Sequence, residues 1–524
     1  MHILFCFMYL LLLVWMPVMT SPVVIMSNAR ETYVKRRELF LQAERKYSLG
    51  ATLELNDDEQ KINETLMTFK QKELEEGFEN PTIFAPARSF LEAVDDINKS
   101  EVFKILRQMP KGAMLHGHDT ALVSADFVIK NITYRDNLYA KLNKSKNDLL
   151  ELRFFQTPPT DDQWKSVKDM RADSGDSKMG TNFDEWLKTK ITLGKSDVGL
   201  DVNTVWQRFS NIFGVIEPML TYEPVWKDYF YQTLKEFHDD NINYLEFRGT
   251  LPDVYTSDGS ILSKVQTCQL YVNTLNKFKK DNPSFFGAKF IYAPHRLADE
   301  QQFLEYIRIA RDLKTAFPDF IAGFDLVGQE DLGHTLYKYS EELQELENEM
   351  NFYFHAGETD WNGFSTDDNL VDAVLLGTKR IGHGYAITKH PKVGEIVKKE
   401  EIGIEICPIS NQVLGLVSDI RNHPATYLIR NNYPIVISAD DPGFWGASGV
   451  SYDWYEAFMG LAAKWQDLQF LKQLAINSIN QSSLDEIQKD KLYEDWELKW
   501  NTFIRNKTTS GVLNLKRSYG NNTL

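Results

Sequence analysis

Residues 112–119, GAMLHGHD, place a short apolar run directly before two histidines and an aspartate. Further runs of apolar, β-branched or aromatic residues follow along the chain, and helix-like segments separate them. Such alternation is typical of a parallel sheet, and eight units favour an α/β (β/α)8 TIM-type barrel over an open doubly wound sheet. The predicted strands are residues 113–115, 244–247, 289–292, 321–324, 352–354, 379–381, 404–406 and 435–437.

Chemically versatile residues follow every one of these runs. The active site of a (β/α)8 barrel lies at the carboxyl ends of its strands, so we expect these residues to meet there. They are His116 to Asp119, Arg248, His295, Asp325 to Gly328, His355 to Glu358, His383, Cys407 to Asn411, and Asp440 with Asp441.

Other segments surround the predicted barrel, which spans residues 106–510. Residues 1–20 are an apolar run followed by small residues, which favours a cleaved secretory signal peptide; an uncleaved anchor is the alternative, because a basic start is missing. Residues 21–105 have the pattern of a helical N-terminal extension. Residues 134–200 lack periodicity and predict an insertion after the first strand, and residues 511–524 predict a flexible tail.

The N-x-Ser/Thr sequences agree with a secreted glycoprotein. Outside the signal segment only Cys268 and Cys407 remain, too few for a disulfide framework, so an ordinary core must stabilise the fold. No later stretch has the length of a membrane span, and we expect no membrane insertion. The acceptor positions are Asn63, Asn98, Asn131, Asn143, Asn480, Asn506 and Asn521.

The formal net charge is −16, and no Lys/Arg patch is interleaved with aromatic residues. Nucleic acids and phosphate-rich partners are bound through such basic patches. The composition therefore argues against both classes of partner, and a neutral ligand is compatible with it.

Four residues at three strand ends predict a metal site. A strand places residues i and i+2 on one face, so His116 and His118 can bind the same ion, although such a pair alone is more often a surface or core feature. His355 and Asp440 follow two other strands and complete a set of three imidazoles and a carboxylate. This set suits one Zn²⁺ per chain with a position left for water, whose pKa the ion lowers towards neutrality.

Three further residues are candidates for the chemistry. Glu358 follows His355 by three positions and can act as a general acid, and His383 can take the proton from the water. Asp441 adjoins Asp440 and can accept a hydrogen bond from a substrate nitrogen. In the alternative interpretation Glu358 and Asp441 are solvated loop acids.

Four motifs in this order resemble the adenosine deaminase family: residues 116–119 (HGHD), 355–358 (HAGE), 381–384 (IGHG) and 438–442 (SADDP). Longer stretches, including residues 405–412 and 416–424, are similar to its secreted branch, the adenosine deaminase-related growth factors. The resemblance implies a secreted, zinc-dependent enzyme that hydrolyses adenosine or 2′-deoxyadenosine to inosine or 2′-deoxyinosine and ammonia. It also implies a homodimer formed through the N-terminal extension.

The same resemblance implies individual roles. The family's zinc ligands fall on His116, His118, His355 and Asp440, its proton donor to purine N1 on Glu358, and the histidine that acts on the attacking water on His383. Its purine contacts fall on Asp441 towards N7 and on the backbone of Gly328 towards N3. Substrate contacts of the secreted branch fall on Asp119, His295 and the segment Trp206 to Phe213. The insertion lacks the cysteine pair that secreted relatives can have, which weakens the expectation that it binds a cell-surface receptor or a glycosaminoglycan; a receptor stays an unproven partner.

Three other functions fit the sequence less well. An AMP deaminase needs cations for the phosphate, and only Arg296 lies near a predicted strand end. A growth factor with a vestigial site would be expected to have lost a ligand or the acid, yet all are present. A two-metal amidohydrolase usually has a lysine after the fourth strand, where residues 323–326 read GFDL.

Overall fold

The computed structural model describes residues 22–143, 148–173 and 182–519. The predicted signal peptide, residues 1–20, lies outside the described residues. In chain order the helices are α1 (Pro22–Lys46), α2 (Asp57–Glu79), α3 (Phe90–Ile97), α4 (Glu101–Leu106), α5 (Ala125–Phe127), α6 (Val167–Asp173), α7 (Phe183–Ile191), α8 (Val202–Leu220), α9 (Glu223–Asp239), α10 (Lys264–Asp281), α11 (Glu300–Ala316), α12 (Ser340–Leu346), α13 (Asn369–Leu375), α14 (Pro391–Lys399), α15 (Pro408–Val413), α16 (Ala425–Arg430), α17 (Ser451–Glu456), α18 (Leu468–Asn480) and α19 (Glu486–Tyr519).

The central sheet is parallel and consists of two hydrogen-bonded groups, in the orders β1-β5-β6-β7-β8 and β12-β11-β10-β9. β8 and β9 belong to one predicted strand, because Phe354 between them still accepts a hydrogen bond from Gly382 of β10. A parallel bridge between Gly117 and Asp440 joins the outer ends of the two groups. The strands are β1 (Gly112–Met114), β5 (Ile242–Gly249), β6 (Gly287–Tyr292), β7 (Ile321–Phe324), β8 (Asn351–Phe352), β9 (His355–Ala356), β10 (Arg380–His383), β11 (Gly403–Ile406) and β12 (Ile435–Ile437).

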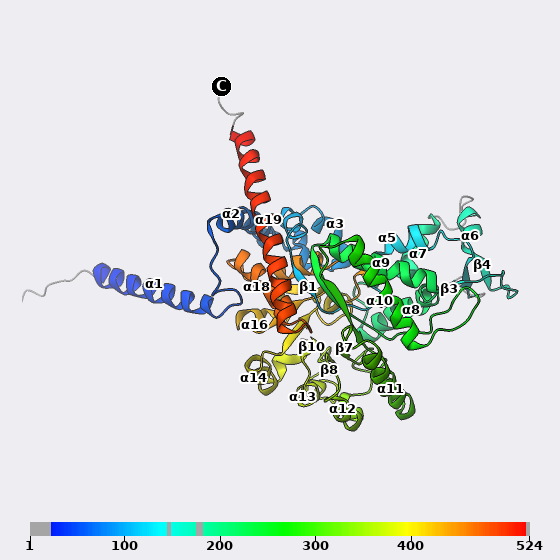
Figure 1. The fold of residues 1–524 in the computed structure, drawn as a ribbon. Helices are drawn as coiled ribbons and strands as arrows, with labels where there is room; N and C mark the ends of the chain where they lie inside the picture. The colour runs from blue at the N-terminus through cyan, green and yellow to red at the C-terminus, as the bar shows by residue number, and fades with distance from the viewer. Residues whose placement is uncertain (1–21, 144–147, 174–181, 520–524) are drawn as a thin grey trace, which may run out of the picture.

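The predicted (β/α)8 barrel is confirmed, since a strand lies at each of the eight predicted runs. Helices surround the sheet (Figure 1). Local sequence signals begin several of them: capping boxes from Ser263 to Gln266 and from Asp299 to Gln302 start α10 and α11. Within the described ranges, no helix is long and apolar enough to cross a membrane.

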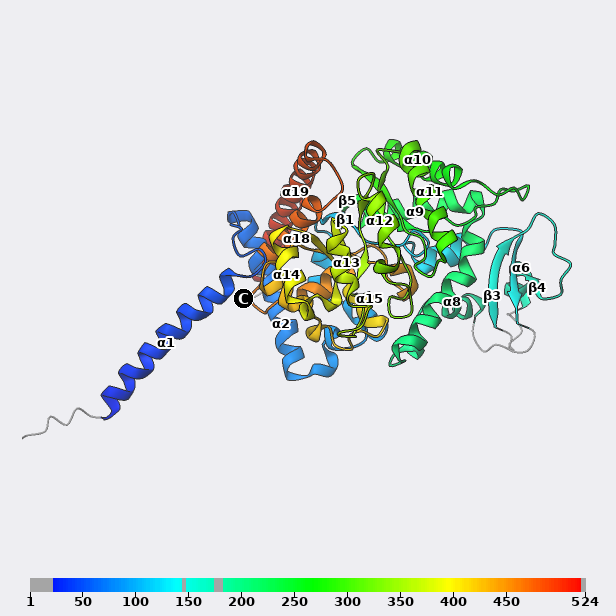
Figure 2. The same cartoon turned by 90° about the horizontal axis from the view of Figure 1, so that it is seen from below.

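The N-terminal extension is helical, and its two long helices differ in their packing. α2 buries Ile62 and Leu66 against the body of the chain, and Glu59 accepts a hydrogen bond from Trp500 of α19 at 2.7 Å. α1 instead projects away from the body (Figures 1 and 2), and its side chains are exposed from residue 29 to residue 46. The carboxy-terminal helix α19 continues into the segment for which the sequence predicts a tail.

The segment predicted as an insertion contains a small antiparallel sheet of β2 (Leu138–Leu142), β3 (Leu149–Phe154) and β4 (Trp164–Ser166), in the order β3-β2-β4. This sheet lies at the end of the molecule opposite α1 (Figure 2), and β3 packs against α8. α8 in turn lines the cavity described below, so the insertion braces one wall of that cavity.

Candidate active site

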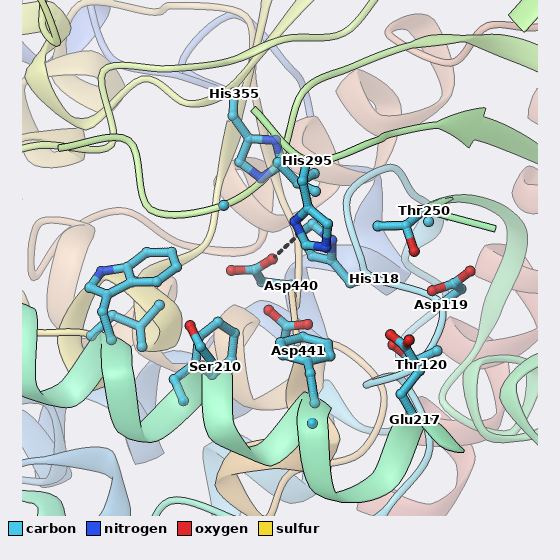
Figure 3. Close-up of a pocket in the computed structure, with 18 of the residues that line it drawn as sticks. His118, Asp119, Thr120, Ser210, Glu217, Thr250, His295, His355, Asp440 and Asp441 are labelled. Carbon is cyan, nitrogen blue, oxygen red and sulfur yellow. Dashed lines mark ion pairs between the residues drawn. The ribbon is translucent and has the colours of Figure 1, made fainter. Parts of the chain in front are cut away.

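A cavity of about 350 Å³ opens at the carboxyl ends of the barrel strands (Figure 3). The predicted substrate-contacting residues all line it, together with most of the predicted metal ligands and both catalytic candidates. The described residues that line it are His118, Asp119, Thr120, Trp206, Phe209, Ser210, Phe213, Gly214, Glu217, Pro218, Gly249, Thr250, His295, Val327, Gly328, His355, Glu358, His383, Leu414, Asp440 and Asp441.

His116, His118, His355 and Asp440 meet at the floor of this cavity, with one ligand atom from each lying within 4.8 Å of the others. They come from the ends of β1, β9 and β12. The Oδ1 atom of Asp440 lies 3.2 Å from Nε2 of His116 and 3.1 Å from Nε2 of His118. The Nε2 atom of His116 and Oδ1 of Asp440 are buried without a hydrogen-bond partner. Buried polar atoms left in this state are what a bound cation would satisfy.

Two buried carboxylates orient the histidines from behind. Nδ1 of His116 lies 2.7 Å from Glu405, and Nδ1 of His355 lies 2.6 Å from Asp325. The guanidinium of Arg248 bridges both acids at 2.7 and 2.8 Å. Each ring therefore directs Nε2 at the cavity, the arrangement in which outer carboxylates fix metal-binding imidazoles. No role for these two acids was predicted from the sequence. The glutamate inside the otherwise apolar run 404–406 is the sequence feature that could have indicated one.

A second group of ligand types contains Cys407 and His383 together with His116 and Asp440. Burial raises the pKa of the Cys407 thiol well above its usual range, so a thiolate is disfavoured. Nδ1 of His383 is already hydrogen-bonded to Asn411 at 3.0 Å. The first group therefore fits a metal ion better, and Cys407, like Cys268, is a buried free cysteine.

Glu358 is buried at the edge of the cavity. Burial raises its pKa well above the usual range, and the charges of Asp440 and Glu330 add to this effect. This shift favours the protonated carboxyl, whose Oε1 atom lies 3.6 Å from Nε2 of His383. Glu330, for which no role was predicted, holds the loop by accepting hydrogen bonds from the backbone N–H groups of Gly357 and Glu358 at 2.9 and 2.7 Å.

The pKa values of Asp119 and Asp441, which directly follow two of the candidate metal ligands in the sequence, are also raised. Burial raises the pKa of Asp119 to about 7, although Tyr271 donates a hydrogen bond to it at 2.7 Å. Burial and the neighbouring Asp440 raise the pKa of Asp441 well above its usual range. Asp441 also has a buried oxygen without a partner. The cavity thus contains carboxyl groups that can donate hydrogen bonds.

Backbone conformation places several of these groups. His383 and Asp440 have φ of 60° and 59°, in the left-handed region that is costly for residues other than glycine. Gly328 has φ of 109°, which only glycine adopts readily, and this brings its backbone to the cavity next to His295. Such strain is held in place by the surrounding structure and is concentrated at functional sites.

α8 forms one wall of the cavity (Figure 3). Trp206 and Phe213 lie on it, and the Trp206 ring also packs edge-to-face on Phe209 at 5.4 Å. Trp206 therefore packs in the hydrophobic core and also lines the cavity. Ser210 and Glu217 on the same helix were not predicted as site residues, because helical periodicity in the sequence does not show which face of the helix lines the cavity.

A (β/α)8 barrel with His-x-His after the first strand, a histidine after the fifth and an aspartate after the eighth defines a metal-dependent hydrolase of the amidohydrolase class. Residues 194–497 match the adenosine deaminase family and residues 7–106 match the adenosine/AMP deaminase N-terminal family. The chain belongs to the adenosine deaminase family.

Curated relatives agree with this assignment. An adenosine deaminase of Phlebotomus duboscqi is 47% identical over 91% of this chain and 93% of its own. Adenosine deaminase 2 of Homo sapiens is 41% identical over 90% of this chain and 93% of its own. Among solved structures, Arabidopsis ADAL complexed with GMP matches with a TM-score of 0.54 at 17% identity, covering 75% of this chain and 98% of that one. This last likeness concerns the fold.

Proposed function

We propose that the protein is a zinc-dependent adenosine deaminase that hydrolyses adenosine and 2′-deoxyadenosine to inosine and 2′-deoxyinosine with release of ammonia. The observation that carries the proposal is the meeting of three histidines and an aspartate with the buried Glu358, whose pKa is raised, at one cavity. The membership of the chain in the adenosine deaminase family supports the same reaction.

His116, His118, His355 and Asp440 would hold the zinc ion. When bound, zinc acts as a Lewis acid and lowers the pKa of a water molecule towards neutrality. Glu358 donates its proton to purine N1, which makes C6 more electrophilic as the water oxygen attacks it. The Glu358 carboxylate left behind takes one proton from the attacking water, and the other water proton goes to the exocyclic nitrogen as ammonia leaves and the C6 carbonyl forms. His383 faces the same space and contacts the attacking water.

The remaining contacts place the purine and the sugar. Asp441 donates a hydrogen bond to N7, because N7 of adenine has no hydrogen and can only accept. The raised pKa of Asp441 favours the protonated carboxyl that such a donor needs. The sequence had suggested an acceptor at this position. The backbone of Gly328 contacts N3, and Trp206 and Phe213 cover the base. Asp119 and His295 contact the ribose.

The charges around the cavity favour a nucleoside over a nucleotide. Asp119, Glu217 and Asp441 line it, and no lysine or arginine occurs among the described residues that do so. Arg296 lies nearby but does not line the cavity, and its Nη2 atom donates to the carbonyl groups of Leu326 and His355, both at 3.1 Å. A phosphate dianion needs cationic donors, so AMP is a poor ligand for this cavity.

Ammonia release from adenosine, measured with and without a chelator, tests the proposal. We expect turnover of adenosine and 2′-deoxyadenosine, loss of activity with the chelator and recovery with added zinc. AMP at the same concentration should be turned over at least roughly 10²-fold more slowly, because no lysine or arginine among the described lining residues is there to bind its phosphate. Absence of ammonia release from both nucleosides by the zinc-loaded protein would reject the function.

Secretion as a glycoprotein is the second part of the proposal. Of the acceptor sequences, Asn98, Asn131, Asn480 and Asn506 are exposed and accessible to a glycan. Asn63 is buried and hydrogen-bonded to Asp467 at 2.7 Å, so the folded chain cannot carry a glycan there. The apolar run of residues 1–20 and the resemblance of residues 405–412 and 416–424 to the secreted branch support an extracellular location.

A homodimer completes the proposal, and α1 is the segment that supports it. Leu39 and Phe40 are 59% and 68% exposed, whereas Ile62 and Leu66 of α2 are buried on their own chain. Exposed apolar side chains on a projecting helix need another surface, which a second copy would supply. The acidic net charge repels a second copy, but salt screens this repulsion beyond about 10 Å. At shorter range, apolar contact dominates.

Removal of residues 1–46 should therefore convert a dimer into a monomer in light scattering at micromolar concentration. This deletion leaves α2 on the barrel, so adenosine turnover should persist. The full-length variant carrying Leu39→Ser and Phe40→Ser should behave as the deletion does. A full-length protein that is already monomeric would reject the dimer.

A further inference from the structure

His383 makes a buried contact on the side of its ring that faces away from the cavity. Its Nδ1 atom lies 3.0 Å from Nδ2 of Asn411 in α15, and Oδ1 of Asn411 lies 2.9 Å from Nε2 of His423. His423 in turn accepts a hydrogen bond at Nδ1 from the backbone N–H of Ala425 at 3.0 Å. We call Asn411 and His423 the relay.

The relay is shielded from solvent. His383 is 1% exposed, and Asn411 and His423 are both 0% exposed. Bulk water therefore cannot replace any of these partners, and each polar atom depends on the neighbour it faces. The direction of each hydrogen bond is then determined by the next one in the chain.

The backbone determines the first direction. The N–H group of Ala425 can only donate, so Nδ1 of His423 is an acceptor and the ring proton of neutral His423 lies on Nε2. This Nε2–H donates to Oδ1 of Asn411, which leaves the amide NH2 of Asn411 facing His383. Nδ1 of His383 must then accept, and its single ring proton lies on Nε2.

Two alternative hydrogen-bond arrangements are disfavoured because each brings two donor groups face to face. Rotating the Asn411 amide by 180° would place its NH2 group against Nε2–H of His423. Protonating both nitrogens of His383 would place Nδ1–H against the NH2 group of Asn411. Either arrangement leaves two buried donors against each other, with the cost of unsatisfied buried groups.

We infer that Asn411 and His423 are positioning residues that hold His383 in the Nε2–H tautomer, so that His383 donates a hydrogen bond into the cavity. Two carboxyl oxygens lie on the cavity side of this nitrogen, beyond hydrogen-bond distance: Oε1 of Glu358 at 3.6 Å and Oδ2 of Asp440 at 3.8 Å. The sequence alone had suggested the opposite direction, with His383 taking a proton from the water.

The inference rests on the proposed function in one respect, the identity of the oxygen that His383 contacts. In a deaminase, Nε2–H would donate to the attacking water oxygen and leave an oxygen lone pair free to point at purine C6. The ring keeps its proton throughout. His383 then contributes orientation and stabilises the negative charge on the oxygen, as fixed donors do in preorganised sites.

Nuclear magnetic resonance of the zinc-loaded protein, labelled with ¹⁵N in its histidine rings, tests the tautomer directly. Couplings between ring nitrogens and carbon-bound protons show which nitrogen carries the proton. The spectrum of a His383→Ala variant identifies the His383 signals. We expect Nε2–H for His383 and for His423; a proton on Nδ1 of His383, or on both nitrogens, would overturn the inference.

Asn411→Asp tests the consequence. A carboxylate offers only acceptors, so His383 should shift its proton to Nδ1 and present a lone pair to the cavity. We expect kcat for adenosine to fall by roughly 10- to 100-fold, as for other residues that orient a site from behind, with KM and zinc content close to wild type. A variant that changes tautomer and keeps the wild-type kcat would show that the tautomer does not matter.

Tyr385→Phe is the matched control. The Tyr385 ring packs edge-to-face on His423 at 5.0 Å, and its hydroxyl donates to the carbonyl of Leu416 at 2.8 Å, outside the relay. This variant should lose a buried hydrogen bond yet keep the tautomer and kcat. An Asn411→Asp chain that fails to fold leaves the wild-type spectrum to decide. Because the spectrum needs no substrate, a protein that is inactive on adenosine would reject the function without rejecting the tautomer.

Discussion

A His118→Ala variant is expected to lose its metal and its activity together. His118 supplies one of the four ligand atoms that lie within 4.8 Å of one another. Removing a partner that only orients a metal ligand typically lowers metal affinity about 10- to 100-fold, and losing a ligand itself should cost more. Metal analysis should therefore find close to one zinc per chain in the wild type and little in the variant, with deaminase activity falling in parallel.

His334→Ala provides the control for this experiment. His334 packs beside Tyr339 and does not line the cavity, so its removal should leave zinc content and turnover unchanged. Full activity in a metal-free preparation of the wild type would end the zinc mechanism. Retention of zinc by His118→Ala would remove this histidine from the ligand set.

Glu358→Gln should lower kcat by at least roughly 10²-fold while zinc stays bound, because general acid catalysis contributes about 10²- to 10⁴-fold. Glutamine keeps the size and the hydrogen-bonding capacity of the side chain but has no acidic proton to donate to purine N1. Burial raises the pKa of Glu358 well above its usual range, and this favours the protonated form that donates to N1. Steady-state kinetics with adenosine and a zinc determination on the same sample measure both quantities.

Asp360→Asn is the matched change two residues further along the loop. Asp360 does not line the cavity, so this variant should turn adenosine over at the wild-type rate. Near-normal turnover by Glu358→Gln would make Glu358 a loop acid and would reject its assignment as the proton donor.

The barrel and the residues at the carboxyl ends of its strands could be predicted from the sequence, because the signals for them are local. Each strand is a run of residues that is buried whatever it pairs with, and the polar residue that follows it comes to the carboxyl end of the sheet by topology alone. His116, His118, His355 and Asp440 could therefore be named together without any contact being known. The capping boxes of α10 and α11 are likewise local signals, since they depend on residues three positions apart.

The structures of the insertion and of the N-terminal extension were harder to predict from the sequence. The strands of the small sheet pair with one another and support α8, so their stability depends on partners that periodicity does not reveal. In the extension, the charged and apolar pattern is similar in α1 and α2. Only the structure shows that Ile62 and Leu66 are buried on the chain's own body while Phe40 is 68% exposed.

The sequence by itself determined the fold class and predicted which residues gather as candidate metal ligands and general acid, because barrel topology brings the ends of the strands together. The tertiary structure alone decided how they are oriented and charged. The contact of His116 with Glu405 joins positions 289 residues apart, and the raised pKa of Glu358 follows from burial by the whole fold. Hydrogen-bond direction at His383 depends in the same way on Asn411 and His423, because a proton's position in a buried chain is determined by every partner in that chain.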